Sequence, residues 1–277
     1  MAEADTIHAD CLPLTVDSMA EQFAACGLAA GQTVIVHSSL SKMGWVAGGA
    51  KAVIEALLRV LTPTGTLVMP AHTSDNSDPA AWQNPPVPEH WWPIIRQHMP
   101  AYDPATSPTR MMGAIAELFR TWPGARRSGH PQGSFAALGP NADYVTHDHA
   151  LESFGPQSPL ARVYELDGYV LLIGVGHSNN TSLHLAEYHA QWPGKRTHQQ
   201  AAAMLVNGER QWVEYEALDI DSDDFDTLGE AYEAAHGITR CHVGQAEVRF
   251  MRQRPLVDFA IKWMAQNRDF TQEVKPT

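Results

Sequence analysis

The stretch that decides the fold is YVLLIGVGHSNNTSLHLAEYH, residues 169–189. It opens on the most apolar run of the chain, Tyr169 to Ile173, and passes through Gly174-Val175-Gly176 into a polar loop. A segment of helical character then begins near Thr181. A short apolar run without alternation is typical of a strand that is buried on both faces of an α/β sheet. The stretch therefore predicts a buried strand, a tight turn and a helix in succession.

The segments before and after this stretch continue the alternation of helix and strand. The sequence predicts a helix capped by Thr15 or Asp17 and ended by Gly27, followed by a strand from Thr33 to Val36. It then predicts a helix in residues 48–65, a strand in 66–72, a helix in 109–122 and a strand in 134–139. After the deciding stretch come a hairpin in 201–220 and a strand with a closing helix in 244–267. This order is that of an α/β layered protein, and the hairpin makes a mixed sheet the expectation. No repeat or low-complexity linker interrupts residues 1–277, so we expect a single domain.

Residues 74–110 are different, because they are rich in proline and tryptophan and carry few helical signals. Long ordered loops in compact domains usually serve as lids or binding surfaces. We expect that role for this segment.

Composition excludes several classes of function. The formal charge of −12 argues against a nucleic-acid partner and suits a cationic small substrate. The three cysteines, Cys11, Cys26 and Cys241, are too few and too scattered for a disulfide framework, which favours a reduced, cytoplasmic setting. The chain shows no signal peptide and no apolar run of the roughly 18 residues that a membrane span needs. Whether it is a monomer or a homodimer is left open.

The deciding stretch admits three kinds of site. A dinucleotide-binding turn would need a third glycine where Asn179 stands. A metal site would favour histidines four apart on a helix, whereas His184 and His189 are five apart, about 140° around it. An acid–base site needs neither, because His184 and Glu187 lie three apart near the start of a helix capped by Thr181, where a carboxylate can fix the imidazole tautomer.

Other candidate residues follow the first two predicted strands. His37 leads into a serine-rich turn ahead of Gly48-Gly49 and the next helix, which suits an anionic ligand or a pantetheine arm. His72 and Asp75 lie just past the second strand, where ligand sites in α/β sheets gather. His147 and His149 are more typical of a solvated loop, and the acidic run 219–230 of a solvated face that could hold a polycation.

Six segments together carry a resemblance to the aminoglycoside 3-N-acetyltransferase family: VHSSLSKMG (36–44), GTLVMPAHT (65–73), PTRMMGAIAELFR (108–120), RSGHPQGSFAALG (127–139), the run 155–189, and DIDSDDFDTLG (219–229). The resemblance covers roughly residues 15 to 265. It implies a three-layer α/β/α fold with a mixed central sheet, distinct from the common small N-acetyltransferase (GNAT) fold, and the pyrophosphate loop of that fold is not found in the sequence. It also implies acetyl-CoA as donor and an aminoglycoside amine as acceptor.

The resemblance also implies residue roles. The family's histidine and its companion acid fall on His184 and Glu187. In the mechanism that fits this pair, His37 or Asp75 is expected to serve as a secondary acid–base group. The expected coenzyme-binding residues are His37, Ser38, Ser39, Leu40, Ser41, Met112 and Gly113. The expected acceptor-binding residues are Asp75, Glu187, Asp221, Asp223 and Asp224, and no metal is expected. The AHTSD segment departs from the family's Trp-Asp or Trp-Glu pattern, which bears on substrate range.

The sequence therefore predicts acetyl-CoA-dependent acetylation of the 3-amino group of aminoglycosides, with His184 as general base and antibiotic resistance as the outcome. Two alternatives remain open at this point. The chain is either an acetyltransferase of the same family acting on another amine metabolite or, with less support, a metal-dependent hydrolase built on its histidines.

Overall fold

The computed structural model describes residues 7 and 12–271. A seven-stranded sheet runs through its centre in the order β3-β4-β2-β1-β5-β9-β8. The strands are β1 (Thr33–Ser38), β2 (Thr66–Pro70), β3 (Arg126–Arg127), β4 (Phe135–Leu138), β5 (Tyr169–Ile173), β8 (Thr239–Val243) and β9 (Ala246–Arg252). β1 lies between β2 and β5 and is parallel to both, whereas the remaining pairs are antiparallel. The prediction of a mixed central sheet is confirmed.

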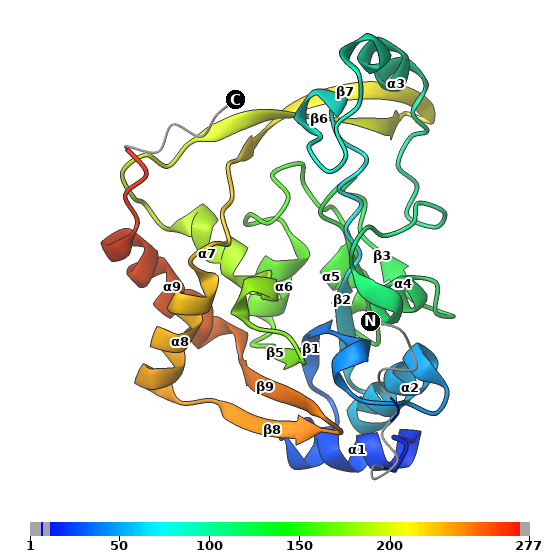
Figure 1. Ribbon diagram of the computed structural model, residues 1–277, viewed down its shortest axis with the longest axis vertical. Coiled ribbons are helices and arrows are strands. Elements are labelled where there is room, and N and C mark those ends of the chain that lie inside the picture. The colour runs from blue at the N-terminus through cyan, green and yellow to red at the C-terminus, as the bar shows by residue number, and fades with distance from the viewer. Residues whose placement is uncertain (1–6, 8–11, 272–277) are drawn as a thin grey trace.

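Helices cover both faces of this sheet (Figure 1). One face carries α1 (Val16–Ala25), α2 (Gly49–Leu61) and α4 (Gly113–Arg120). The other carries α5 (Ala142–Thr146), α6 (Pro159–Glu165), α7 (Ser182–His189), α8 (Phe225–His236) and α9 (Gln253–Asn267). Alternate side chains of β1 serve the two faces, since Val34 and Val36 belong to one apolar cluster and Ile35 to the other. The result is the expected three-layer α/β/α arrangement.

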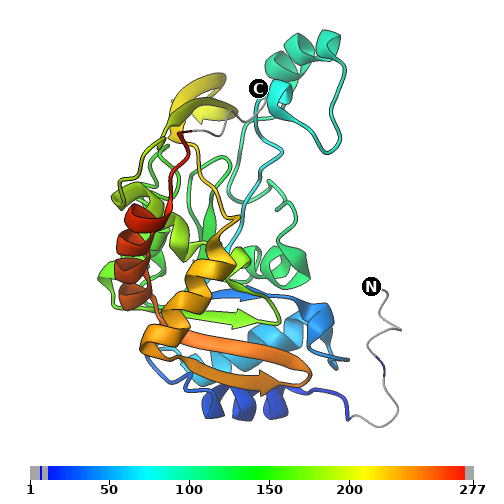
Figure 2. The same ribbon diagram turned by 60° about the vertical axis from the view of Figure 1, so that its left-hand side comes forward.

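A two-stranded hairpin, β6 (Thr197–Val206) and β7 (Glu209–Leu218), stands apart from the central sheet. Its turn is Asn207-Gly208 with both φ angles positive, 53° and 83°, as tight hairpin turns require. Figures 1 and 2 show it beside α3 (Trp92–His98), which belongs to the long proline-rich segment. Asn76 joins the two by exchanging hydrogen bonds of 3.1 Å with the backbone of Ala203.

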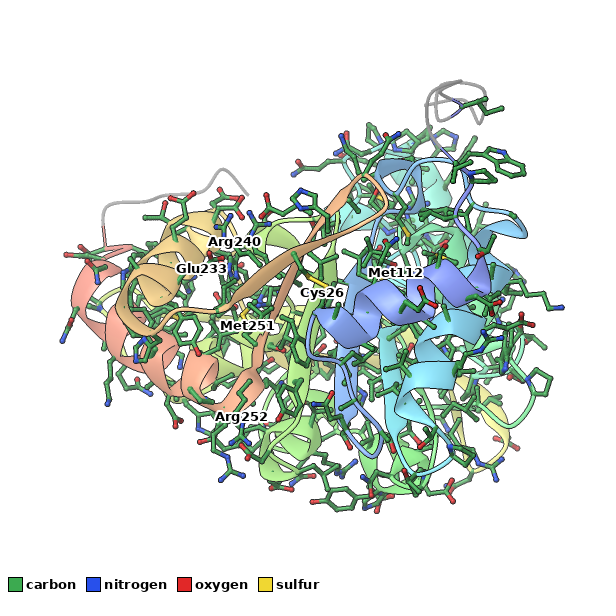
Figure 3. All side chains as sticks on the ribbon, turned by 90° about the horizontal axis from the view of Figure 1, so that it is seen from below. Cys26, Met112, Glu233, Arg240, Met251 and Arg252 are labelled. Carbon is green, nitrogen blue, oxygen red and sulfur yellow. A yellow bond between two sulfur atoms is a disulfide. The ribbon has the colours of Figure 1, made fainter. Side chains whose placement is uncertain are left out.

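Two expectations about the fold need correction. Cys26 and Cys241 form a disulfide between the end of α1 and β8 (Figure 3), so these two cysteines are not reduced in the structure. The acidic run is only partly a solvated face, because it leads directly into α8, whose Phe225 and Leu228 are buried. No helix in the described ranges is long and apolar enough to cross a membrane.

Candidate active site

His184 and Glu187 form a hydrogen-bonded pair on α7. His184 Nδ1 lies 2.5 Å from Glu187 Oε2, and the exposed fractions of the two side chains are 13% and 0%. Two aromatic rings contact the imidazole: the Phe154 ring stacks on it at 5.1 Å, and the Phe225 ring lies tilted against it at 4.8 Å. With the carboxylate at Nδ1, this nitrogen carries the proton, which leaves the Nε2 lone pair as the basic position.

Arg268 holds the second oxygen of Glu187. Its Nη1 donates to Glu187 Oε1 at 2.6 Å, while its Nε and Nη2 donate to the Asp224 carboxylate at 2.7 and 2.6 Å. The Asp221 backbone N–H donates to the same Glu187 oxygen at 2.9 Å. Burial opposes the charged form of Arg268, but its bonds to Asp224 and Glu187 outweigh this, and its pKa is raised.

This network contains three residues that the sequence predicts to bind the acceptor. Glu187 is buried, and both of its carboxylate oxygens are hydrogen-bonded within the protein. The Asp224 carboxylate is occupied by Arg268. Asp221 contributes its backbone to the network, and its carboxylate accepts from the Asp223 backbone N–H at 2.8 Å. Sequence reasoning missed Arg268 because its partners lie 81 and 44 residues away.

A pocket of about 290 Å³ opens beside His184. The described residues that line it are His72, Ser74, His130, Gln132, Gly133, Ser153, Phe154, Thr181, His184, Tyr188, His198, Gln200, Tyr215, Ala217, Leu218 and Ile220. None of these is an aspartate or glutamate. The hairpin forms one wall, and Tyr215 fixes that wall by donating from its hydroxyl to Gln132 Oε1 at 2.9 Å. Histidines, aromatic rings, amides, hydroxyls and a few aliphatic side chains therefore line the pocket beside His184.

His37 lies at the end of β1, within reach of α7. Its Nε2 is 3.3 Å from Thr181 Oγ1, so the Thr181 hydroxyl is hydrogen-bonded to His37 instead of capping α7. Asn180 Oδ1 accepts from the Ser182 backbone N–H in its place. Burial, and secondarily the nearby His184, lower the pKa of His37 to about 3. The lowered pKa favours the neutral form of His37 near pH 7, and its ring is hydrogen-bonded to the Thr181 hydroxyl.

Three further histidines cluster around the pocket. Burial is the main cause that lowers the pKa of His72 to about 3, of His130 to about 4, and of His149 well below its usual value. His130 Nδ1 accepts from the Gly133 backbone N–H at 2.8 Å, and His149 Nδ1 lies 2.9 Å from Ser128 Oγ. The prediction that the HDH segment is solvated is therefore right for the exposed His147 and wrong for His149.

The serine-rich turn follows β1 and is tied to the end of β5. The Ser39 backbone N–H donates to the Ile173 carbonyl at 2.9 Å, and the Ser39 and Ser41 hydroxyls lie 3.3 Å apart. The deciding stretch needs glycine at position 174, because a Cβ there would lie only 2.6 Å from Lys42 Cβ. Met112 and Gly113 start α4, and Met112 packs against the same apolar cluster as Leu40.

Asp75 lies outside the pocket that contains His184. It lines an adjoining pocket of about 230 Å³ with Trp82, Asn84 and Arg110 from the proline-rich segment. Ser74 lines both pockets, so the two are neighbours. Asp75 is therefore placed to meet a ligand that extends beyond the first pocket.

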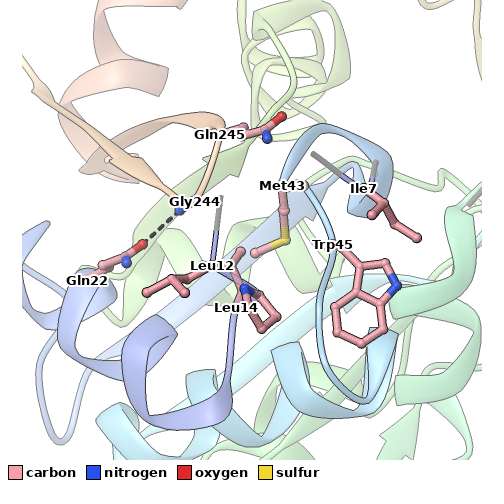
Figure 4. A pocket seen from close by; sticks show the side chains of 10 residues that line it. Ile7, Leu12, Leu14, Gln22, Met43, Trp45, Gly244 and Gln245 are labelled. Carbon is pink, nitrogen blue, oxygen red and sulfur yellow. Dashed lines mark hydrogen bonds between the residues drawn. The ribbon is translucent and has the colours of Figure 1, made fainter. Parts of the chain in front are cut away.

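A larger pocket, about 540 Å³, lies elsewhere. Figure 4 shows its lining, which includes Leu14, Met43 and Trp45, with Gln22 Oε1 accepting from the Gly244 backbone N–H at 2.7 Å. No candidate acid–base residue lines it, so size alone does not identify the reactive site. In the described part of the chain, no three His, Cys, Asp or Glu side chains are grouped to hold a metal ion.

Comparison with known proteins identifies a single family. Residues 35–265 match the family model described as aminoglycoside 3-N-acetyltransferase. The chain is 45% identical over 263 residues to the aminoglycoside N(3')-acetyltransferase-like protein YokD of Bacillus subtilis, with 94% of this chain and 96% of that protein covered. It is 34% identical to aminoglycoside N(3)-acetyltransferase III of Pseudomonas aeruginosa, with 91% and 94% covered.

Solved structures agree with the sequence matches. The crystal structure of YokD from Bacillus subtilis superposes with a TM-score of 0.93 at 43% identity, covering 98% of this chain and 100% of that one. AAC-IIIb in binary complex with CoASH gives 0.83 at 30% identity, with 96% and 100% covered. AAC-VIa bound to sisomicin gives 0.84 at 30% identity, with 93% and 99% covered.

Proposed function

Because the chain belongs to the aminoglycoside 3-N-acetyltransferase family, we propose that it transfers the acetyl group of acetyl-CoA to the 3-amino group of an aminoglycoside, with His184 as general base. The observation that carries this proposal is the buried His184–Glu187–Arg268 network at the wall of a pocket. The binding of CoASH by AAC-IIIb and of sisomicin by AAC-VIa, two structures of the same fold, supports both substrates.

The residues divide the work of the reaction. Acetyl-CoA supplies an activated acetyl group as a thioester. His184 Nε2 takes the proton that the amine loses as it attacks, while Glu187 keeps the Nδ1 proton in place and stabilises the imidazolium. The same proton then neutralises the departing thiolate, so proton and charge balance. The Ser39 N–H donates to the Ile173 carbonyl, so the other backbone N–H groups of the Ser38 to Ser41 turn are proposed to stabilise the charge on the carbonyl oxygen.

The turn after β1 and the start of α4 are proposed to hold the coenzyme. The residues Ser38, Ser39, Leu40 and Ser41 end β1 and begin a short 3-10 helix. Gly48 is the N-cap of the 13-residue helix α2, and the N-terminus of a helix favours anionic groups. Met112 and Gly113 pack on the same side of the sheet as α2.

Removing the imidazole tests the mechanism. We expect His184→Ala to lower kcat by about 10²- to 10⁴-fold, the usual contribution of a general base. The measurement is acetyl-CoA turnover with gentamicin, tobramycin and apramycin. His184→Gln is the matched variant, because it keeps a hydrogen-bonding group but supplies no base. Turnover near the wild-type rate in both variants would remove His184 from the mechanism.

The exposed acidic segment supports a polycationic acceptor. Asp223 is exposed and follows the network residue Asp221. We expect Asp223→Asn to raise the KM for tobramycin a few-fold at low salt and to have little effect at high salt, because exposed charges are screened. The KM for acetyl-CoA should stay constant, and an equal rise in both KM values would point to a folding defect.

A second acceptor class is favoured by one observation. None of the described residues that line the pocket at His184 carries a carboxylate, although a polycation is usually held by several. An amine metabolite with fewer positive charges would fit this lining. A screen of acetyl-CoA turnover against monoamines and aminoglycosides separates the two, since the better acceptor has the higher kcat/KM.

A further inference from the structure

His72 is a pocket-lining histidine that the mechanism above does not use. It follows β2, and its ring packs against Phe135 at 5.2 Å and Phe154 at 5.3 Å. Phe154 is also the ring that stacks on His184. The two histidines therefore contact one aromatic side chain and line one pocket.

The hydrogen bonding of His72 sets it apart from its neighbours. Its Nε2 is buried and has no hydrogen-bond partner among the described residues. In His130 and His149, by contrast, both ring nitrogens are bonded, with His130 Nε2 at 3.2 Å from the Leu151 carbonyl and His149 Nε2 at the Ser153 carbonyl. Those two rings hold the loops around the pocket, whereas His72 Nε2 makes no hydrogen bond among the described residues.

An unpaired buried nitrogen is costly, and native structures pair such groups in the great majority of cases. Because the His72 side chain lines this pocket, its unpaired buried nitrogen is a candidate partner for a polar group of a ligand that enters it. The other buried atoms of this kind include Trp192 Nε1 and Gln253 Oε1, and neither side chain lines this pocket.

The charge state of His72 determines what it can bind. Burial, followed by the nearby His37 and His184, lowers its pKa to about 3, so it is neutral near pH 7. His130 and Arg127 also act against its protonation, and no carboxylate faces it from the described lining residues. A neutral imidazole offers one N–H donor and one lone pair. It suits a hydroxyl or another neutral polar group and is a poor partner for an anion.

We propose that His72 is an acceptor-binding residue, whose free ring nitrogen hydrogen-bonds a neutral polar group of the acceptor and holds the neighbouring amine at His184. The inference rests on the proposed function, in which this pocket receives the acceptor. It assigns His72 to recognition and leaves proton transfer to His184.

A pair of substitutions tests this role. His72→Phe keeps a ring against Phe135 and Phe154 but cannot hydrogen-bond, whereas His72→Gln retains a donor and an acceptor. We expect His72→Phe to lower kcat/KM for tobramycin about tenfold, through KM, as the loss of one hydrogen bond to a buried group implies. His72→Gln should recover part of this loss. The KM for acetyl-CoA and the pH midpoint of kcat/KM should stay as in the wild type.

Calorimetric titration with tobramycin, in the absence of acetyl-CoA, separates binding from turnover. About tenfold weaker binding to His72→Phe, with recovery in His72→Gln, supports the inference even if the wild type acetylates nothing, in which case only the proposed function fails. Unchanged binding in His72→Phe, a fall in kcat alone, equal losses in both variants with lower thermal stability, or no binding to the wild type would each overturn it.

Discussion

The Glu187 carboxylate accepts hydrogen bonds from three donors: the His184 imidazole, the Arg268 guanidinium and the Asp221 backbone N–H. We expect Glu187→Gln to lower kcat by at least about 10²-fold, because an amide N–H at Nδ1 forces the proton onto Nε2 and removes the base. The KM for acetyl-CoA should change little. Steady-state kinetics would contradict this if kcat stayed near the wild-type value while KM rose.

Arg268 and Glu187 form a buried ion pair, in which the two side chains are 1% and 0% exposed. Among the described residues, Arg268 is the only lysine or arginine whose side chain pairs with the Glu187 carboxylate. We expect Arg268→Met to destabilise the fold by about 3–5 kcal/mol, because Glu187 would keep a buried charge without its partner. The matched control is Arg126→Met, which breaks the exposed pair with Asp143 and should cost about 1 kcal/mol or less. Urea unfolding of both variants makes the comparison, and equal losses would contradict the prediction.

At the scale of elements, the packing of the serine-rich turn against the end of β5 depends on Gly174. Its φ angle is 65°, and a Cβ at this position would have no room beside Lys42. We expect Gly174→Ala to cost about 1–3 kcal/mol by displacing that turn and to raise the KM for acetyl-CoA. Gly208→Ala is the control, since that glycine also has positive φ but nothing within 4 Å. It should cost about 1 kcal/mol and leave the KM for acetyl-CoA unchanged. Similar KM values in the two variants would exclude the turn from coenzyme binding.

At the scale of the whole molecule, buried neutral histidines make stability depend on pH. His37 and His72, with pKa values lowered to about 3, and His130, lowered to about 4, take up protons far more readily when unfolded. The contribution of these histidines to the free energy of unfolding is therefore fully present above about pH 6.5. It is lost as the pH falls toward their pKa values in the folded protein. Each such histidine contributes a slope of about 1.4 kcal/mol per pH unit in that window.

Urea unfolding between about pH 7.5 and pH 5 measures this slope. His72→Phe should reduce it by about one histidine's share, while His147→Gln, at an exposed position, should leave it unchanged. A slope that is the same in wild type and His72→Phe would show that His72 titrates normally in the folded protein.

Much of the layered fold could be predicted because its elements carry strong local patterns. α1 begins after Thr15, whose side chain accepts from the Ser18 backbone N–H. β1, β2 and β5 follow apolar runs that are almost entirely buried, and α2 follows a helical apolar pattern that buries one face. β8 was not predicted, because TRCHV is a mostly exposed strand without a hydrophobic pattern. The residues of α8 were assigned to a solvated face because their acidic character masks Phe225 and Leu228.

The candidate site could be predicted only where its members are close in sequence. His184 and Glu187 are three apart and were paired from spacing. Arg268 and the stacking ring of Phe154 come from distant segments that only the folded chain brings to α7. The Cys26–Cys241 disulfide spans 215 residues and has no local signal either. The proposed roles of the remaining site residues stay predictions until the substitutions above are made.

The position of Arg268 also has a consequence for how the enzyme is made. His184 and Glu187 leave the ribosome well before Arg268, which follows them 81 residues after Glu187. Until α9 has docked and carried Arg268 into place, Glu187 lacks its counter-charge and His184 lacks a fixed tautomer. A chain still being synthesised would therefore contain His184 without the ion pair that supports it, and we expect activity to begin only once translation has passed α9 and Arg268.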